Sequence, residues 1–263
     1  MSRKTFKIIL SYDGTKYFGW QRQEKFLTVQ GILEHALFKF FGNDIKTFGA
    51  GRTDAGVHAY GQVVSFAADT MIPAKNFKSI LNGLLPDDIR VISVSDAPAG
   101  LNPRYNVKQK LYRFIICNSP QYYAVYNGRC WHIPEKLDIQ KMKEAAKMLS
   151  GRHNFYSFSK AGNDTKEYTR TIDSITIKKN GKWLILDFKG KSFLYNMVRR
   201  LTAIIVLYGQ GQLTADDITK MLETQDRSLV RNTAPPQGLY LVKITYDKRN
   251  VSKRYGSDDE GDE

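Results

Sequence analysis

Strand-like and helix-like segments alternate along the chain, and this order narrows the folds that it can adopt. In the first hundred residues we expect strand, helix, strand, strand, helix, strand. Their ranges are 4–12, 29–41, 45–50, 60–68, 73–85 and 89–94. Thr28 can cap the first helix through its hydroxyl, and Gly42 is the kind of residue that ends one. The pattern mixes both element types and favours an α+β fold.

The second half repeats the alternation with longer segments. We expect strands at 107–118, 172–179, 183–188 and 239–246, and helices at 138–149, 196–208 and 214–224. Asn180-Gly181 is a turn signal between two of these strands and predicts a hairpin. Segment 196–208 is apolar nearly all round, which predicts a buried helix. Two halves of similar order predict two related sheets that meet near residues 98–107.

The charge of the chain indicates an anionic partner. Its 263 residues include 40 Lys and Arg against 26 Asp and Glu, a formal charge of +14. Five of those acids lie in residues 257–263, which carry no base, so residues 1–256 have a net charge of +19. A body this basic favours nucleic acid as the partner. We expect residues 248–263 to form a solvated acidic tail.

Several classes of protein are excluded on composition. The first residues lack the apolar run of a signal peptide, and the longest apolar stretch, near 201–208, is far shorter than the ~20 residues of a membrane helix. We therefore expect no membrane association. Two cysteines cannot form a disulfide framework, which indicates a reducing, cytoplasmic location. The four histidines are scattered, so we expect no metal site.

The densest chemical signal is the glycine-rich segment 49–59, GAGRTDAGVHA. Its glycines and alanines surround one carboxylate, Asp54, with small neighbours that leave it sterically open. The alternative is that Asp54 only caps a tight turn. The segment lacks the Gly-Lys-Ser/Thr of a phosphate-binding loop and is not a dinucleotide fingerprint.

Two arginines, Arg199 and Arg200, lie at the start of the predicted buried helix. An unpaired buried charge is costly, so at least one should have a carboxylate or phosphate partner. The alternative is that both side chains extend from the first turn to the surface.

The strand at 107–118 places basic and aromatic residues together. Side chains alternate along a strand, so Lys108, Lys110, Tyr112 and Phe114 share one face. Such a face suits phosphate binding and base stacking. By pattern alone, an ordinary sheet with Tyr112 and Phe114 in the core fits as well.

Taken together, these motifs resemble those of the tRNA pseudouridine synthases of the TruA family. The resemblance runs nearly end to end and is most specific at the aspartate segment. The matching motifs are YDGT at 12–15, FGWQ at 18–21, TVQ at 28–30, GRTDAGVHA at 51–59, GQV at 61–63, YRF at 112–114, FYSF at 155–158, RTI at 170–172, FLYNMVR at 193–199 and GLYL at 238–241.

The resemblance implies a fold of two ferredoxin-like α/β subdomains with antiparallel sheets, joined across a central basic cleft. The N-terminal subdomain would span 1–106 and carry the aspartate loop, the C-terminal one 107–247. The implied activity is isomerisation of uridine to pseudouridine in the anticodon stem-loop of tRNA, at positions 38, 39 and 40. The family uses no cofactor and no metal, acts in the cytoplasm and is expected to form a homodimer.

The resemblance also assigns roles to residues. Asp54 is the catalytic carboxylate, Arg199 its basic partner, and Tyr112 stacks on the target uracil. Arg52 fills the space of the flipped nucleotide, and Leu241 falls near the apolar wall of the uracil pocket. From the strand pattern, and not from the resemblance, Lys108 and Lys110 are expected to bind substrate.

The reaction breaks the C1′–N1 bond of uridine, turns the uracil and joins its C5 to C1′. Asp54 could attack C1′, stabilise positive charge there, or abstract a 2′-proton. A second reading is a catalytically silent tRNA-binding protein on the same scaffold. The chain departs from the family pattern at Arg200, in the lysine-rich approach to Tyr112 and in the acidic tail, which leaves the modified tRNA positions open.

Overall fold

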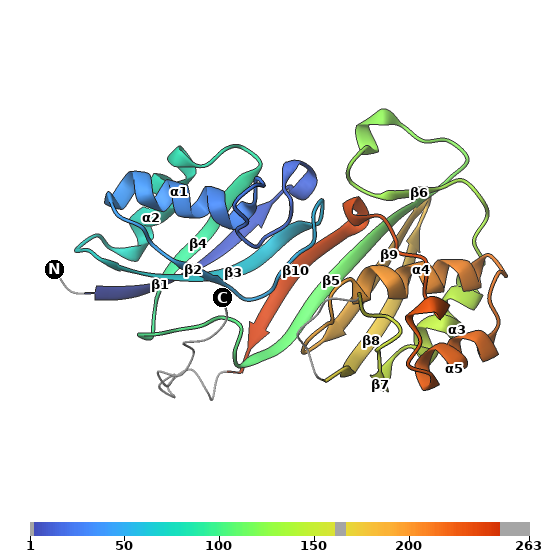
Figure 1. Cartoon of the computed structure of the whole chain (residues 1–263). Coiled ribbons are helices and arrows are strands. Elements are labelled where there is room, and N and C mark those ends of the chain that lie inside the picture. Colours follow the sequence, from blue (N-terminus) through green and yellow to red (C-terminus); the bar gives the residue numbers. More distant parts are fainter. Residues whose placement is uncertain (1–2, 161–166, 248–263) are drawn as a thin grey trace.

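The computed structural model describes residues 3–160 and 167–247, which form an α+β fold around one large sheet. The acidic tail predicted at 248–263 lies outside the described residues. Figure 1 shows helices α1 and α2 against one half of the sheet and α3, α4 and α5 against the other.

The N-terminal half has the predicted order of elements. Its strands are β1 (Arg3–Tyr12), β2 (Thr47–Gly49), β3 (His58–Asp69) and β4 (Ile89–Ala97), and its helices are α1 (Val29–Phe41) and α2 (Ala74–Leu84). The Thr28 hydroxyl accepts a hydrogen bond from the Gly31 N–H, and Gly42 ends α1 at a φ of 75°. Both capping predictions are confirmed. Strand β2 is shorter than the predicted 45–50.

The C-terminal half also follows the predicted order, with two additional short strands. Its strands are β5 (Val107–Asn118), β6 (Trp131–Ile133), β7 (Gly151–Asn154), β8 (Thr169–Asn180), β9 (Trp183–Gly190) and β10 (Leu239–Tyr246). Its helices are α3 (Ile139–Met148), α4 (Met197–Gly209) and α5 (Ala215–Glu223). Strands β6 and β7 have only three and four residues, too few for a periodic signal.

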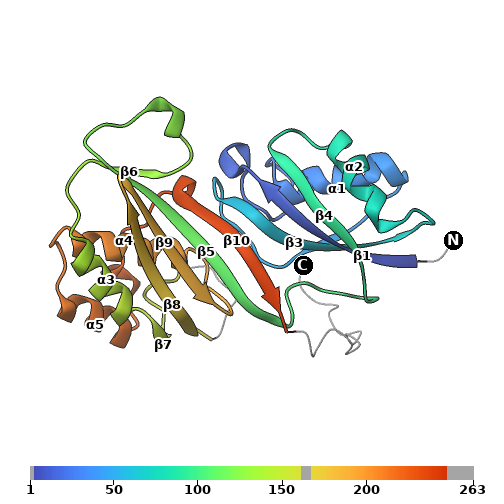
Figure 2. The ribbon, with the colours of Figure 1, turned by 180° about the vertical axis from the view of Figure 1, so that it is seen from behind.

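The two predicted sheets are halves of one continuous sheet with the strand order β4-β1-β3-β10-β5-β9-β8-β7. Figure 2 shows this order from behind. The halves meet where β10, the last strand of the chain, pairs in parallel with β3 and antiparallel with β5. Residues far apart in the sequence therefore become neighbours at the centre of the sheet.

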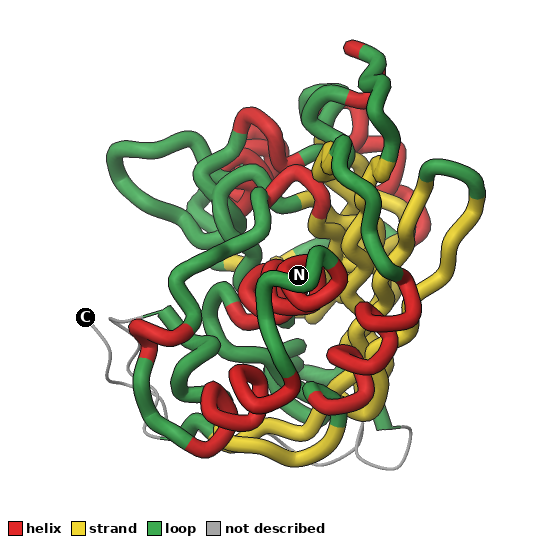
Figure 3. Tube along the Cα trace, turned by 90° about the vertical axis from the view of Figure 1, so that its right-hand side faces the viewer, coloured by secondary structure: helices red, strands yellow, loops and turns green. Residues whose placement is uncertain are grey.

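All the α-helices cover the same face of the sheet. On β1 this face carries the buried Phe6, Leu10 and Tyr12. Tyr12 is paired with Ala59 on β3, and Ala59 with Leu241 on β10. Leu241 is in turn paired with Tyr112, so these side chains share the face. In the side view of Figure 3 the strands gather mainly toward the right and bottom of the picture, with helices beside and in front of them. Between the two helix groups, the central strands carry the candidate site.

Candidate active site

The glycine-rich segment forms a loop that joins β2 to β3, and its backbone is fixed on the sheet side. Gln62 Nε2 donates to the Gly51 carbonyl at 2.7 Å, and Lys110 Nζ donates to the Ala50 carbonyl at 2.8 Å. The Ala50 N–H donates to the Val63 carbonyl. Backbone polar groups paired in this way leave little freedom to the loop.

The segment between β1 and α1 fixes the same loop from the other side. The Trp20 N–H donates to the Thr53 carbonyl at 3.0 Å, and the Gly56 N–H donates to the Tyr17 carbonyl at 3.2 Å. Gly19 lies so close that a Cβ on it would be 2.5 Å from the Thr53 carbonyl oxygen, and its φ is 92°. Only glycine fits both the contact and the backbone conformation.

Asp54 lies in a turn of this loop, but its carboxylate does more than cap the turn. The turn is closed by the backbone, because the Val57 N–H donates to the Asp54 carbonyl. The side chain forms an ion pair with Arg199 of α4, at 3.1 Å from NH1 to Oδ2. The two residues are 145 positions apart, and their side chains are 16% and 14% exposed for Arg199 and Asp54.

Arg199 is held by further contacts. Its Nε donates to the Ala234 carbonyl at 2.8 Å, and NH1 donates to Asn196 Oδ1 at 3.1 Å. Arg200 points elsewhere and donates to the carbonyls of Ser157 and Ser159. The prediction that one of the two arginines has a carboxylate partner is confirmed, and that residue is Arg199.

The protonation of Asp54 reflects two opposed effects. Burial raises the pKa of its carboxyl above the usual range, while the charge of Arg199, its hydrogen bond and the charge of Lys160 lower it. Burial is the larger effect, so the pKa of Asp54 is raised. Arg199 limits this rise and favours the ionised form. A carboxyl whose pKa is shifted by burial and by one charged partner is a candidate functional group.

Tyr112 and Leu241 lie side by side near the loop on the helix-covered face. Leu241 is fully buried and Tyr112 is nearly so. The ring of Tyr112 contacts Phe193 edge to face, with 5.3 Å between centroids. A Cβ on Gly51 would lie 3.8 Å from the Tyr112 hydroxyl, which places that hydroxyl against the aspartate loop. The charge of Asp54 is among the effects that raise the Tyr112 pKa, after burial.

The remaining predicted site residues occupy different surroundings. Arg52 is exposed on the aspartate loop, and Lys108 is exposed on β5. Lys110 instead turns toward the loop backbone through its contact with Ala50. Burial and the nearby charge of Arg104 lower its pKa to about 8. The structure thus brings Asp54, Arg199, Tyr112, Leu241 and Lys110 together, with Arg52 and Lys108 outside this group.

Comparison with known proteins shows to which family this chain belongs. A family model described as tRNA pseudouridine synthase matches residues 8–106 and 145–247. The chain belongs to the tRNA pseudouridine synthase family. The tRNA pseudouridine synthase A of Thermoanaerobacter sp. (strain X514) is 41% identical over 239 residues, covering 91% of this chain and 98% of that protein. The protein of the same name from Prochlorococcus marinus (strain MIT 9312) is 38% identical, covering 97% and 96%.

Family membership confirms the resemblance that was inferred from the motifs. It also confirms the expected pseudouridine synthase fold. The matched spans contain Asp54, Arg52, Arg199 and Leu241, whereas Tyr112 and the two strand lysines lie in the unmatched segment 107–144. The family match therefore does not bear on these three residues, and only their positions in the structure do.

Sequence reasoning missed several residues of the site. Asn196 adopts a left-handed conformation, with φ of 61°, and accepts the hydrogen bond from Arg199. The charge of Lys160 lowers the pKa of Asp54, and burial together with the charge of Asp54 raises the pKa of Tyr195. Lys160 Nζ lies 5.4 Å from the centroid of the Tyr195 ring. The motif FLYNMVR contains Asn196 and Tyr195, but nothing in the sequence shows where their side chains point.

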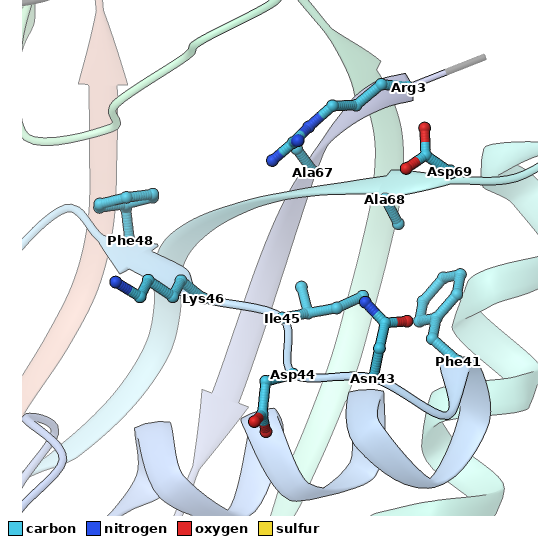
Figure 4. Close-up of a pocket in the computed structure, with 10 residues that line it drawn as sticks. All are labelled: Arg3, Phe41, Asn43, Asp44, Ile45, Lys46, Phe48, Ala67, Ala68 and Asp69. Carbon is cyan, nitrogen blue, oxygen red and sulfur yellow. The ribbon is translucent and has the colours of Figure 1, made fainter.

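Other features of the structure lie away from this site. A pocket of about 420 Å³ extends from the start of β1 to the end of β3, and Figure 4 shows Arg3, Asp69 and Phe48 in its wall. None of the predicted site residues lines it. In residues 3–160 and 167–247, no three His, Cys, Asp or Glu residues are grouped to hold a metal ion. No helix within these ranges is long and apolar enough to span a membrane.

Proposed function

We propose that this protein isomerises uridine to pseudouridine in the anticodon stem-loop of tRNA, at positions 38, 39 and 40, with Asp54 as the catalytic carboxylate. The observation that carries the proposal is the ion pair between Asp54 and Arg199. It holds a largely buried carboxylate on a loop that is fixed by backbone hydrogen bonds, on the part of the sheet that carries Tyr112 and Leu241.

The chemistry requires an oxygen nucleophile or a negative charge near the anomeric carbon. Cleavage of the C1′–N1 bond leaves positive character on C1′, and an ionised Asp54 can attack that carbon or stabilise the charge. Abstraction of a 2′-proton is the third possible role. Arg199 orients the carboxylate in each case, because Asn196 and the Ala234 carbonyl hold its guanidinium in place.

The residue types beside Asp54 suit a detached uracil. The flat Tyr112 ring can stack on the base while Leu241 provides an apolar wall. A target uridine in a stem or at its junction must leave the base stack, which costs a few kcal/mol. Arg52 is exposed on the same loop and is positioned to occupy the vacated space.

The charge of the chain supplies the remaining binding energy. A net charge of +19 over residues 1–256 favours contacts with many phosphates of the tRNA. The exposed Lys108 is one candidate for such a contact, and Lys110 another once the loop contacts RNA. We further propose that the protein acts in the cytoplasm as a homodimer, in which both subunits hold one tRNA.

A silent tRNA-binding protein on the same scaffold would need no such carboxylate. The retained Asp54–Arg199 pair is costly to bury and therefore favours the enzyme.

The proposal is tested by incubating the purified protein with unmodified tRNA transcripts and mapping pseudouridine by carbodiimide labelling and primer extension. We expect primer-extension stops one nucleotide 3′ of positions 38, 39 or 40 in transcripts that have uridine there. Transcripts with cytidine at those positions serve as controls. Stops elsewhere would refute the assigned positions, and their absence in every transcript would refute the activity.

A further inference from the structure

The loop that connects β1 to α1 carries an exposed aromatic pair beside the aspartate loop. Tyr17 and Trp20 are buried, at 5% and 2% exposure, and anchor this loop through the backbone hydrogen bonds described above. Between and after these anchors, Phe18 and Phe26 are 50% and 48% exposed. The loop thus fixes two aromatic rings at the surface instead of burying them.

The two rings are stacked on each other and held in place. Their centroids are 4.1 Å apart and their planes differ by 12°. The Phe18 N–H donates to the Leu27 carbonyl at 2.8 Å, and Gln23 pairs with Phe26 as an isolated β-bridge. Leu27, 53% exposed, extends the apolar surface. We call Phe18 and Phe26 the aromatic platform.

The chain segment that carries Phe18 lies against the backbone of the aspartate loop. Phe18 directly precedes Gly19, on which a Cβ would be only 3.2 Å from the backbone carbon of Asp54. Adjacent Cα atoms are about 3.8 Å apart, and stacked bases about 3.4 Å. The step from Phe18 to Gly19 is comparable with the spacing of neighbouring nucleotides, so a nucleotide beside a uridine at Asp54 is the occupant that we assign to the platform. Of the exposed charges here, Lys25 and Arg52 outnumber the acid Glu24 on this loop, and this balance favours a polyanionic occupant over a neutral one.

We propose that an unpaired nucleobase next to the target uridine stacks on the outer face of the aromatic platform. This inference rests on the proposed function and adds a second base-binding surface to it. Stacking on an aromatic ring tolerates any base, because every base has a π face. Such a surface would let one enzyme hold tRNAs whose anticodon loops differ in sequence. The rings are ordered before binding, which lowers the entropic cost of the contact.

The test compares RNA binding by platform variants and by a matched control. Binding is measured by titration of fluorescent anticodon stem-loop RNA in the Asp54→Asn background, where no turnover disturbs equilibrium. The variants are Phe18→Ala, Phe26→Ala and Phe18→Tyr, and the control is Phe38→Ala, a 45% exposed phenylalanine on α1. Each is tested with intact RNA and with RNA abasic at single positions beside the target.

We expect the alanine variants to weaken binding about tenfold, as the loss of one base–aromatic contact does. One abasic substitution should weaken binding by the parent to a similar extent, and should have no further effect on Phe18→Ala. Phe18→Tyr and Phe38→Ala should bind like the parent. Unchanged melting temperatures would show that the alanine variants remain folded.

Three outcomes would overturn the inference. The alanine variants could bind as tightly as the control, or every abasic RNA could lose the same affinity with Phe18→Ala as with the parent. Sedimentation could also show that Phe18→Ala and Phe26→Ala dissociate a dimer, which would make a second copy of this chain the occupant. The proposed function has a separate readout, since pseudouridine formation by the unmodified enzyme can persist when the platform fails these tests.

Discussion

At the scale of single residues, the site depends on the protonation of the Asp54 carboxyl group. Burial favours its neutral form, and the charge of Arg199 favours its ionised form. Burial raises the pKa of Asp54, and Arg199 opposes that effect. The reactive species is the ionised form, so activity is expected to fall as pH decreases through this raised pKa.

Replacing Arg199 should therefore change both stability and the pH profile. We expect Arg199→Ala to lower activity at least a hundredfold and to destabilise the fold on the order of 3 kcal/mol, because it leaves a buried carboxylate unpaired. The acid limb of the rate profile should move to higher pH. Single-turnover rates between pH 5.5 and 8.5 and urea unfolding measure these effects.

Arg200→Ala is the matched control for that variant. Arg200 contacts the carbonyls of Ser157 and Ser159 and not Asp54. Its loss should reduce stability and leave the acid limb in place. If Arg199→Ala unfolds and reacts like the parent, the ion pair has no role in either property.

Lys110 gives an independent prediction about pH. Its pKa in the folded state is about 8, below the ordinary value of 10.5. Between these values the unfolded chain holds a proton that the folded chain has released, so this residue makes stability rise with pH. Below pH 8 the folded chain also holds this proton, so Lys110 no longer makes stability depend on pH. In Lys110→Met, the rise between pH 8 and 9.5 should be smaller than in the parent, as measured by urea unfolding at each pH. Equal pH dependence would contradict the assigned burial of the ammonium group.

At the scale of elements, the loop before α1 and the aspartate loop act as one unit. Gly19 has a φ of 92°, and any Cβ would collide with the Thr53 carbonyl. Gly42 has a φ of 75°, and a Cβ there would meet nothing within 4 Å. Substitutions at these two positions therefore distinguish the effect of backbone strain from the effect of displacing the loop that carries Asp54.

We expect Gly42→Ala to cost about 1–2 kcal/mol of stability from the left-handed backbone alone and to leave turnover unchanged. Gly19→Ala should cost more and should also lower kcat, because the loop that carries Asp54 must shift. Thermal unfolding and single-turnover rates test both. A normal kcat in a destabilised Gly19→Ala would show that the contact has no effect on catalysis.

The sequence predicted most elements and singled out Asp54 as the candidate catalytic residue, and the reason differs from case to case. Asp54 was found because its small neighbours form a local pattern, and the capping of α1 depends on Thr28 and Gly42 alone. The pairing of β10 with β3 depends on contacts between distant segments, which no local pattern encodes. The same holds for the choice of Arg199 over Arg200 and for Lys110, whose contact with Ala50 joins β5 to the aspartate loop.

At the scale of the whole molecule, one continuous sheet holds two halves in a fixed relation around the site. Asp54 comes from the first half and Arg199 and Tyr112 from the second. Either half alone lacks part of the site, so we expect catalysis to require the intact chain. The predicted subdomain boundary near residue 106 does not divide the sheet. Strand β10 returns from the end of the chain to the centre of the sheet and lies between β3 of the first half and β5 of the second.

The charge of the molecule predicts how binding responds to salt. With +19 over residues 1–256, the logarithm of the binding constant for tRNA should fall linearly with the logarithm of salt concentration. Between 50 and 200 mM KCl we expect a loss of at least about tenfold, measured by filter binding with the Asp54→Asn variant. Affinity independent of salt would show that phosphate contacts contribute little.

The most direct test of the account is the rate at which Asp54→Asn releases tritium from tRNA labelled at C5 of uridine, since joining C5 to C1′ expels that hydrogen. We predict tRNA binding within a few fold of the unmodified enzyme and a rate at least about 10³-fold lower. Tritium release by Asp54→Asn at the rate of the unmodified enzyme would contradict the assignment of Asp54 as the catalytic carboxylate.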